Sequence, residues 1–161
     1  GYICQYMNPK FKLEYKDSVK SNMGVVNSDN GLVGITYTTT DHFSTVISLI
    51  NTDLMISAKI KNLGHYGSLM WDGKHPNTMQ LHDIPKHAKV EIGDTIVTSG
   101  YSNILPANIK IGVITKYKPE KNTNFLNISI DLFTDFTNIQ SAYVVNPMWK
   151  FEREIIEKKI K

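Results

Sequence analysis

The chain has 161 residues, of which 41% are hydrophobic and 20% charged, and its formal net charge is +3. This length suits one domain or two small ones, with a core large enough to fold without disulfides. The mild charge, with lysines scattered among acidic residues, argues against the basic stripe of nucleic-acid-binding proteins, and no run of about 18 apolar residues predicts a membrane-spanning helix.

Turn signals divide the chain into short segments with the alternation typical of strands. Asn30-Gly31 marks a tight hairpin turn, because Asn-Gly accepts the positive φ angles of such turns. The clearest period-two pattern is Leu126–Leu132, in which apolar residues alternate with polar ones. Strands are predicted at 24–26, 32–40, 44–50, 56–60, 68–71, 79–82, 95–98, 109–114, 126–132 and 143–145, with one or two more before residue 14. Strands at this spacing predict an all-β barrel or sandwich.

The segment 90–112 combines a turn, a strand, a long loop and a second strand. Gly93-Asp94 forms the turn, Ser99-Gly100 ends the first strand, and Pro106 lies in the loop, because a residue without an N–H is excluded from central strands. We expect Gly100 to adopt a positive φ angle and the hydroxyls of Thr98 and Ser99 to bond nearby backbone groups. The segment is therefore interpreted as structural rather than reactive.

One alternative is a double-barrel serine hydrolase. His42, Asp53 or Asp94, and Ser99 follow one another in the chain order of the chymotrypsin triad. A triad is defined by geometry and not by order, and Ser99 lies in Thr-Ser-Gly rather than in a Gly-Asp-Ser-Gly-Gly turn that would build an oxyanion hole. The distance between the His42 ring and the Ser99 hydroxyl would test this hypothesis.

Another alternative is a sugar-binding β module, with Trp71 and Trp149 as its platform. Aromatic residues at strand positions are more often packing residues. The five histidines form no tight ligand motif, and no glycine-rich phosphate loop joins a strand to a helix. The sequence therefore predicts neither a metal nor a cofactor.

The string Gly93–Gly100, GDTIVTSG, resembles the "GDxVVTSG" segment of the rod shape-determining MreC family. Leu105-Pro106 and the residues from Ile109 to Ile114 resemble its "FPxGIPVGxV" continuation. Further segments at 23–26, 31–35, 44–53, 130–135 and 143–145 resemble family segments in the same order, so the match covers about residues 13–146. The departures, at Ala107-Asn108 and Leu132-Phe133, touch no catalytic role and bear only on the shape of the loops.

The resemblance implies a non-enzymatic scaffold of bacterial cell elongation that maintains rod shape. It implies a periplasmic, extracytoplasmic location, with a single N-terminal membrane anchor that precedes the region present here. It also implies self-association, as a homodimer or a filament, and partners that include a penicillin-binding transpeptidase, MreD and the actin-like MreB. It supplies no catalytic residue, metal ligand or cofactor site. Ten positions match family motifs and are expected to determine turns and loops: Gly34, Asp53, Gly64, Gly93, Asp94, Thr98, Ser99, Gly100, Pro106 and Gly112.

For the fold, the residues and the resemblance together predict two small antiparallel β-barrels. Residues 1–53 and 117–149 are expected to form the first barrel, and residues 54–116, which hold their own set of strands and turns, a second barrel inserted into it. Residues 150–161 are expected to form an amphipathic helix or a disordered tail, because Phe151, Ile155, Ile156 and Ile160 would share one helical face.

Overall fold

The structure is a computed structural model, and it describes residues 2–5, 19–40, 43–102 and 104–145. These residues form strands and connecting loops, without a helix, which confirms the all-β prediction. The strands are β1 (Tyr2–Gln5), β2 (Gly24–Val26), β3 (Leu32–Thr39), β4 (Phe43–Ser48), β5 (Met55–Ile60), β6 (Tyr66–Met70), β7 (Thr78–Pro85), β8 (Thr95–Thr98), β9 (Lys110–Pro119), β10 (Phe125–Leu132) and β11 (Tyr143–Val145). Within these ranges no helix is long and apolar enough to cross a membrane. The predicted tail at 150–161 lies outside the described residues.

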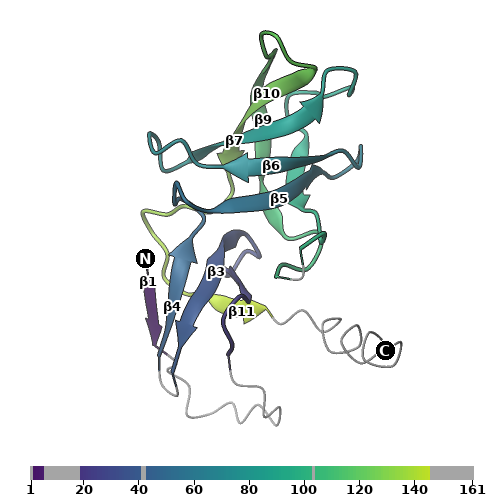
Figure 1. The fold of residues 1–161 in the computed structure, drawn as a ribbon. Coiled ribbons are helices and arrows are strands. Elements are labelled where there is room, and N and C mark those ends of the chain that lie inside the picture. Colours follow the sequence, from purple (N-terminus) through teal and green to yellow (C-terminus); the bar gives the residue numbers. More distant parts are fainter. Residues whose placement is uncertain (1, 6–18, 41–42, 103, 146–161) are drawn as a thin grey trace, which may run out of the picture.

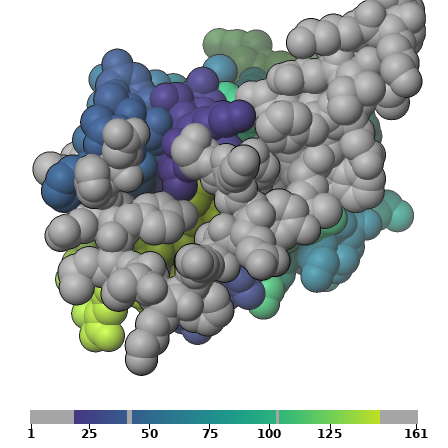
Figure 2. Space-filling model, turned by 90° about the horizontal axis from the view of Figure 1, so that it is seen from below, coloured from purple at the N-terminus to yellow at the C-terminus, as the bar shows by residue number. Residues whose placement is uncertain are grey.

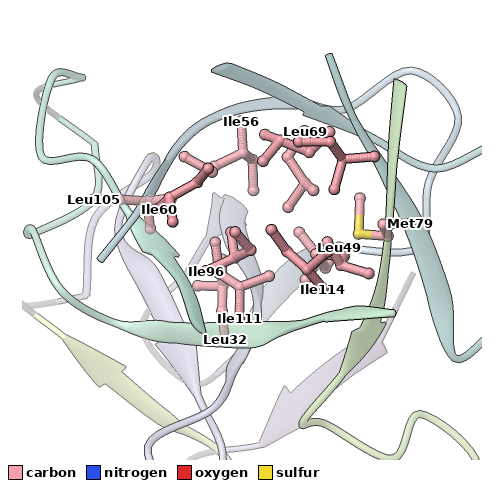
Figure 3. Close-up of a cluster of buried hydrophobic side chains, with 14 of the residues drawn as sticks. Leu32, Leu49, Ile56, Ile60, Leu69, Met79, Ile96, Leu105, Ile111 and Ile114 are labelled. Carbon is pink, nitrogen blue, oxygen red and sulfur yellow. The ribbon is translucent and has the colours of Figure 1, made fainter. Parts of the chain in front are cut away.

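Six consecutive strands form a closed antiparallel barrel in the order β10-β7-β6-β5-β8-β9 (Figure 1). Its interior follows from the alternation of each strand, since successive side chains of a strand point to opposite faces. In β5, for example, Ile56, Ala58 and Ile60 are buried while the residues between them are more exposed. Figure 3 shows Ile56, Leu69 and Met79 among the side chains that fill this interior.

The other unit is a five-stranded antiparallel sheet in the order β1-β4-β3-β2-β11. In the sequence, β1 to β4 precede the barrel strands and β11 follows them. β11 pairs with β2, so the chain returns to this sheet after the barrel is complete. Figure 2 shows this end of the molecule from below, with purple and blue sheet strands and yellow-green β11 on one face. Of the two predicted barrels, one is therefore closed, and the other is a sheet with β1 and β11 at its edges.

The predicted C-terminal boundary of the inserted barrel was wrong. β10 pairs with β7 on one side and with β9 on the other, so Leu126–Leu132 belongs to the closed barrel and not to the first unit. β9 also continues to Pro119, beyond the predicted end of the barrel at residue 116. The physical reason is that an alternating pattern reports one buried face of a strand but does not report which strands lie beside it.

The sheet and the barrel share one hydrophobic core. Leu32 of β3 and Leu49, which follows β4, are fully buried and cluster with the barrel residues Ile96 and Ile111 (Figure 3). A hydrogen bond from the Thr134 hydroxyl to the carbonyl oxygen of Leu32, 2.9 Å long, joins the segment after β10 to the start of β3. The sheet therefore packs on the barrel through apolar contacts and a buried polar link.

Candidate functional site

The Thr98 side chain holds the long loop between β8 and β9 closed. Its hydroxyl donates a 2.6 Å hydrogen bond to the carbonyl oxygen of Pro106 and accepts a 2.9 Å hydrogen bond from the N–H of Ile109. The Thr98 carbonyl oxygen also accepts a hydrogen bond from the N–H of Asn108. Because Thr98 is fully buried, these bonds satisfy groups that water cannot reach, and they fix both ends of the loop.

Ser99 is a structural link between β8 and β5. Its hydroxyl donates a 2.9 Å hydrogen bond to the Ser57 hydroxyl and accepts a 3.0 Å hydrogen bond from the N–H of Tyr101. The side chain is buried. His42, the proposed base of the hydrolase alternative, lies outside the described residues. The hydroxyl that the hydrolase would use as nucleophile is thus engaged in two hydrogen bonds that hold the fold together.

Gly100 occupies a backbone conformation that other residues resist. Its φ angle is +74°, which confirms the predicted positive value. A Cβ atom placed there would lie 2.6 Å from the Cβ of Ala107, much closer than two carbon atoms in van der Waals contact. Both the angle and the crowding explain why glycine stands at this position.

Changes at the neighbouring residues Ser99 and Gly100 should therefore differ in effect. We expect Ser99→Ala to lower the free energy of unfolding by about 1 kcal/mol, the usual value for one neutral hydrogen bond. Gly100→Val should cost about 2 to 4 kcal/mol, because it adds a β-branched side chain at a positive φ angle and against Ala107. Thermal unfolding of the two variants beside the parent chain measures the difference. Equal, negligible effects would show that the turn is not needed.

The other predicted positions fall into three groups. Gly64 and Gly93 adopt positive φ angles of 68° and 97° at turns, whereas Gly34 and Gly112 lie in strands at points where a Cβ atom would overlap the carbonyl oxygen of a neighbouring strand. The remaining two are turn residues: Asp94 accepts a 3.0 Å hydrogen bond from the N–H of Glu91, and Asp53 donates its own N–H to the Asn51 side chain at 2.8 Å. The structure thus gathers only Thr98, Ser99, Gly100 and Pro106 in one loop.

Sequence reasoning missed three polar residues that organise the sheet. The Thr36 hydroxyl is fully buried, donates to the Lys20 carbonyl oxygen at 2.6 Å and accepts from the N–H of Met23 at 2.8 Å. Thr134 makes the link to Leu32 described above. The Asn27 side chain accepts hydrogen bonds from the N–H groups of Asp29 and Gly31. Only Asn27 had a sequence signal, since Asn favours turns of this kind; threonine in a strand-like segment is indistinguishable from an ordinary β-former.

Among the charged and aromatic side chains that the structure describes, Asp135 and Trp71 are held by hydrogen bonds. Hydrogen bonds from the Thr137 side chain and N–H hold the pKa of the exposed Asp135 below its ordinary value. Among these residues no group of three or more His, Cys, Asp or Glu could hold a metal ion. Trp71 is partly buried against the core and donates its indole N–H to the His75 carbonyl oxygen at 2.8 Å. Trp149, the other half of the proposed sugar platform, lies outside the described residues.

The family model "Rod shape-determining protein MreC, barrel core" matches residues 15–146. The chain belongs to the MreC family. The cell shape-determining protein MreC of Listeria monocytogenes is 30% identical over 124 residues, which cover 73% of this chain and 42% of that protein. This chain therefore spans less than half of the length of that relative. MreC is a structural, shape-determining family and not a family of enzymes.

Solved MreC structures share the fold. The Listeria monocytogenes MreC structure has a TM-score of 0.73 at 27% identity, covering 80% of this chain and 62% of that one. A complex of penicillin-binding protein PBP2 with MreC from Helicobacter pylori has a TM-score of 0.61 at 16% identity, covering 79% and 80%. The major periplasmic domain of the cell shape-determining filament MreC has a TM-score of 0.63 at 21% identity, covering 73% and 72%. MreC proteins thus include a periplasmic domain with this architecture.

Proposed function

We propose that this chain is the extracytoplasmic binding module of a cell-elongation scaffold. Its partners are a penicillin-binding transpeptidase and further copies of itself. The proposal includes a periplasmic location, anchorage to the inner membrane by a segment that precedes this region, and a connection through MreD to the actin-like MreB. Family membership and the complex between a Helicobacter pylori MreC and PBP2 support it.

The observation that carries the proposal is the distribution of polar and apolar side chains over the described barrel. The hydroxyls of Thr98 and Ser99, which could have served chemistry, are used in internal hydrogen bonds. Large apolar side chains are instead exposed on the outer surface, with Tyr101 and Met55 among them. Exposed aromatic residues and methionines are enriched where proteins bind other proteins. This surface chemistry supports a role in binding other proteins.

Binding to the purified periplasmic part of the penicillin-binding transpeptidase from the same organism tests the proposal. We expect saturable binding with a dissociation constant in the micromolar range, because interfaces of transient assemblies are small. An unrelated all-β protein of similar size and charge serves as the control. Absence of binding at about 100 µM of both proteins would contradict the transpeptidase part of the proposal, since a specific but transient contact is populated at such concentrations.

A further inference from the structure

The outer face of β5 and β6 carries a short row of outward-pointing side chains. Three cross-strand pairs follow one another: Met55 opposite Met70, Ser57 opposite Ser68, and Lys59 opposite Tyr66. Ile56, Ala58 and Leu69, which alternate with them along the strands, are buried in the barrel, so these six side chains point outwards. We call these six residues the outer stripe. Its ends are large and its centre is small.

Each end of the outer stripe carries large, exposed apolar or aromatic side chains. The exposed fractions are 64% for Met55, 37% for Met70 and 49% for Tyr66. Tyr101, 79% exposed, extends the tyrosine end, since its ring meets that of Tyr66 edge to face at a centroid separation of 5.5 Å. Methionine and aromatic side chains attract one another and recur at protein interfaces. The two ends are therefore suited to contact each other across an interface.

The two ends also carry opposite charges. Lys59, partly buried at the tyrosine end, forms no ion pair with any described residue. Asp53 lies exposed two residues before Met55, and its carboxylate has no hydrogen-bond or ion-pair partner in the described ranges. Among the described residues, the surface thus has an unpaired lysine at one end and an unpaired aspartate at the other. If a second copy faces it in the opposite direction, the lysine of each copy lies near the aspartate of the other.

We propose that the outer stripe is a contact between two copies of this chain, related by a two-fold axis that runs along the Ser57–Ser68 row between the two faces. The tyrosine end of each copy then covers the methionine end of the other, and Lys59 of each copy reaches Asp53 of the other. The small serines at the axis let the two sheets approach closely. The inference rests on the self-association part of the proposed function and assigns a surface to it.

The size of the outer stripe makes this contact weak on its own. Two strands of about six residues present a face of roughly 20 by 10 Å, well below the about 800 Å² per partner that a stable interface buries. Such a contact becomes effective when copies are already held close together, because the effective concentration of a tethered partner is in the millimolar range. Self-association of the isolated chain is therefore expected to be weak and sensitive to salt.

A charge exchange tests the contact. Lys59→Glu and Asp53→Lys each place like charges opposite each other twice in a homodimer, and each should weaken self-association at least about tenfold, the effect of two lost charge pairs. An equal mixture of the two variants restores both pairs and should self-associate like the parent chain. Lys118→Glu and Asp29→Lys make the same charge changes elsewhere on the surface and serve as controls. Sedimentation equilibrium at low salt measures all six samples, and thermal unfolding checks that each variant is folded.

The outcomes separate the inference from the proposed function. Recovery in the mixture, with unchanged controls, supports the outer stripe as the contact. If the parent chain self-associates and both stripe variants do so equally, or if the mixture fails to recover, the stripe is overturned and the proposed function stands. If the parent chain stays monomeric at about 1 mM, self-association of this module and the stripe fail together, since tethered copies reach only such concentrations. Variants that self-associate normally but lose transpeptidase binding would assign the stripe to that enzyme and overturn the inference.

Discussion

Gly112→Val is expected to prevent the barrel from closing. Gly112 lies in β9 between Leu132 of β10 and Ile96 of β8. A Cβ atom at this position would overlap the carbonyl oxygen of Asp131 and lie 2.9 Å from its carbonyl carbon. Both atoms belong to the backbone, so no side-chain rotation relieves the overlap, and β9 and β10 would have to separate. We expect a loss of more than about 4 kcal/mol, a large part of the 5 to 15 kcal/mol that typically stabilises a domain.

Circular dichroism during thermal unfolding measures this effect, and Gly64→Ala is the matched control. Gly64 has a positive φ angle of 68° but open space around its Cβ position. Alanine there should cost only about 1 to 2 kcal/mol, the penalty of the left-handed conformation alone. A Gly112→Val protein that melts within a few degrees of the parent chain would show that the close approach of β9 and β10 is not required.

Leu32→Ala should destabilise the sheet and the barrel together by about 2 to 5 kcal/mol, the cost of truncating a fully buried leucine. Leu32 begins β3 of the sheet, yet it belongs to the core cluster that includes Ile96 and Ile111 of the barrel (Figure 3). The cavity would therefore open at the junction of the two units. We expect the sheet and the barrel to unfold in one cooperative transition whose midpoint shifts to a lower denaturant concentration.

Guanidinium unfolding monitored by tryptophan fluorescence and by circular dichroism measures the loss. Tyr37→Ala, an exposed change later in the same strand, should leave the midpoint nearly unchanged. Two separate transitions in the Leu32→Ala variant, with that of the barrel unmoved, would contradict a shared core.

The strands were readable from the sequence, but their arrangement was not. The alternation at Leu126–Leu132 predicted β10 correctly, because period two reflects one buried face. That face packs inside the closed barrel rather than in the first unit, since the partners of a strand are set by contacts distant in the sequence. Closure of a sheet also depends on contacts distant in the sequence. Two closed barrels were predicted, whereas the described residues of the first unit form an open sheet. A turn is a local feature, and the sequence predicted one at Asn30-Gly31. Asn30 has the expected positive φ angle of 59°, whereas Gly31 does not, and the connection between Val26 and Leu32 is longer than a tight hairpin turn.

The features of the candidate site also differ in whether the sequence could predict them. Gly100 was predicted with its positive φ angle because the conformational freedom of glycine is a property of one residue. The hydrogen bond between the Ser99 and Ser57 hydroxyls joins residues from different strands and has no sequence signature. The outer stripe depends on which residue of β5 faces which residue of β6, and register of this kind is fixed by the whole barrel.

The path of the chain sets an order in which the protein can fold during its synthesis. The six strands of the barrel are contiguous in the sequence, so they can assemble as soon as Leu132 has left the ribosome. β2, made much earlier, gains β11 as its second neighbour only when Tyr143–Val145 has emerged. Until then β2 offers an unpaired edge, which is the feature of nascent chains that favours aggregation. Among the described strands, the last one made is thus the one that covers the open edge of β2.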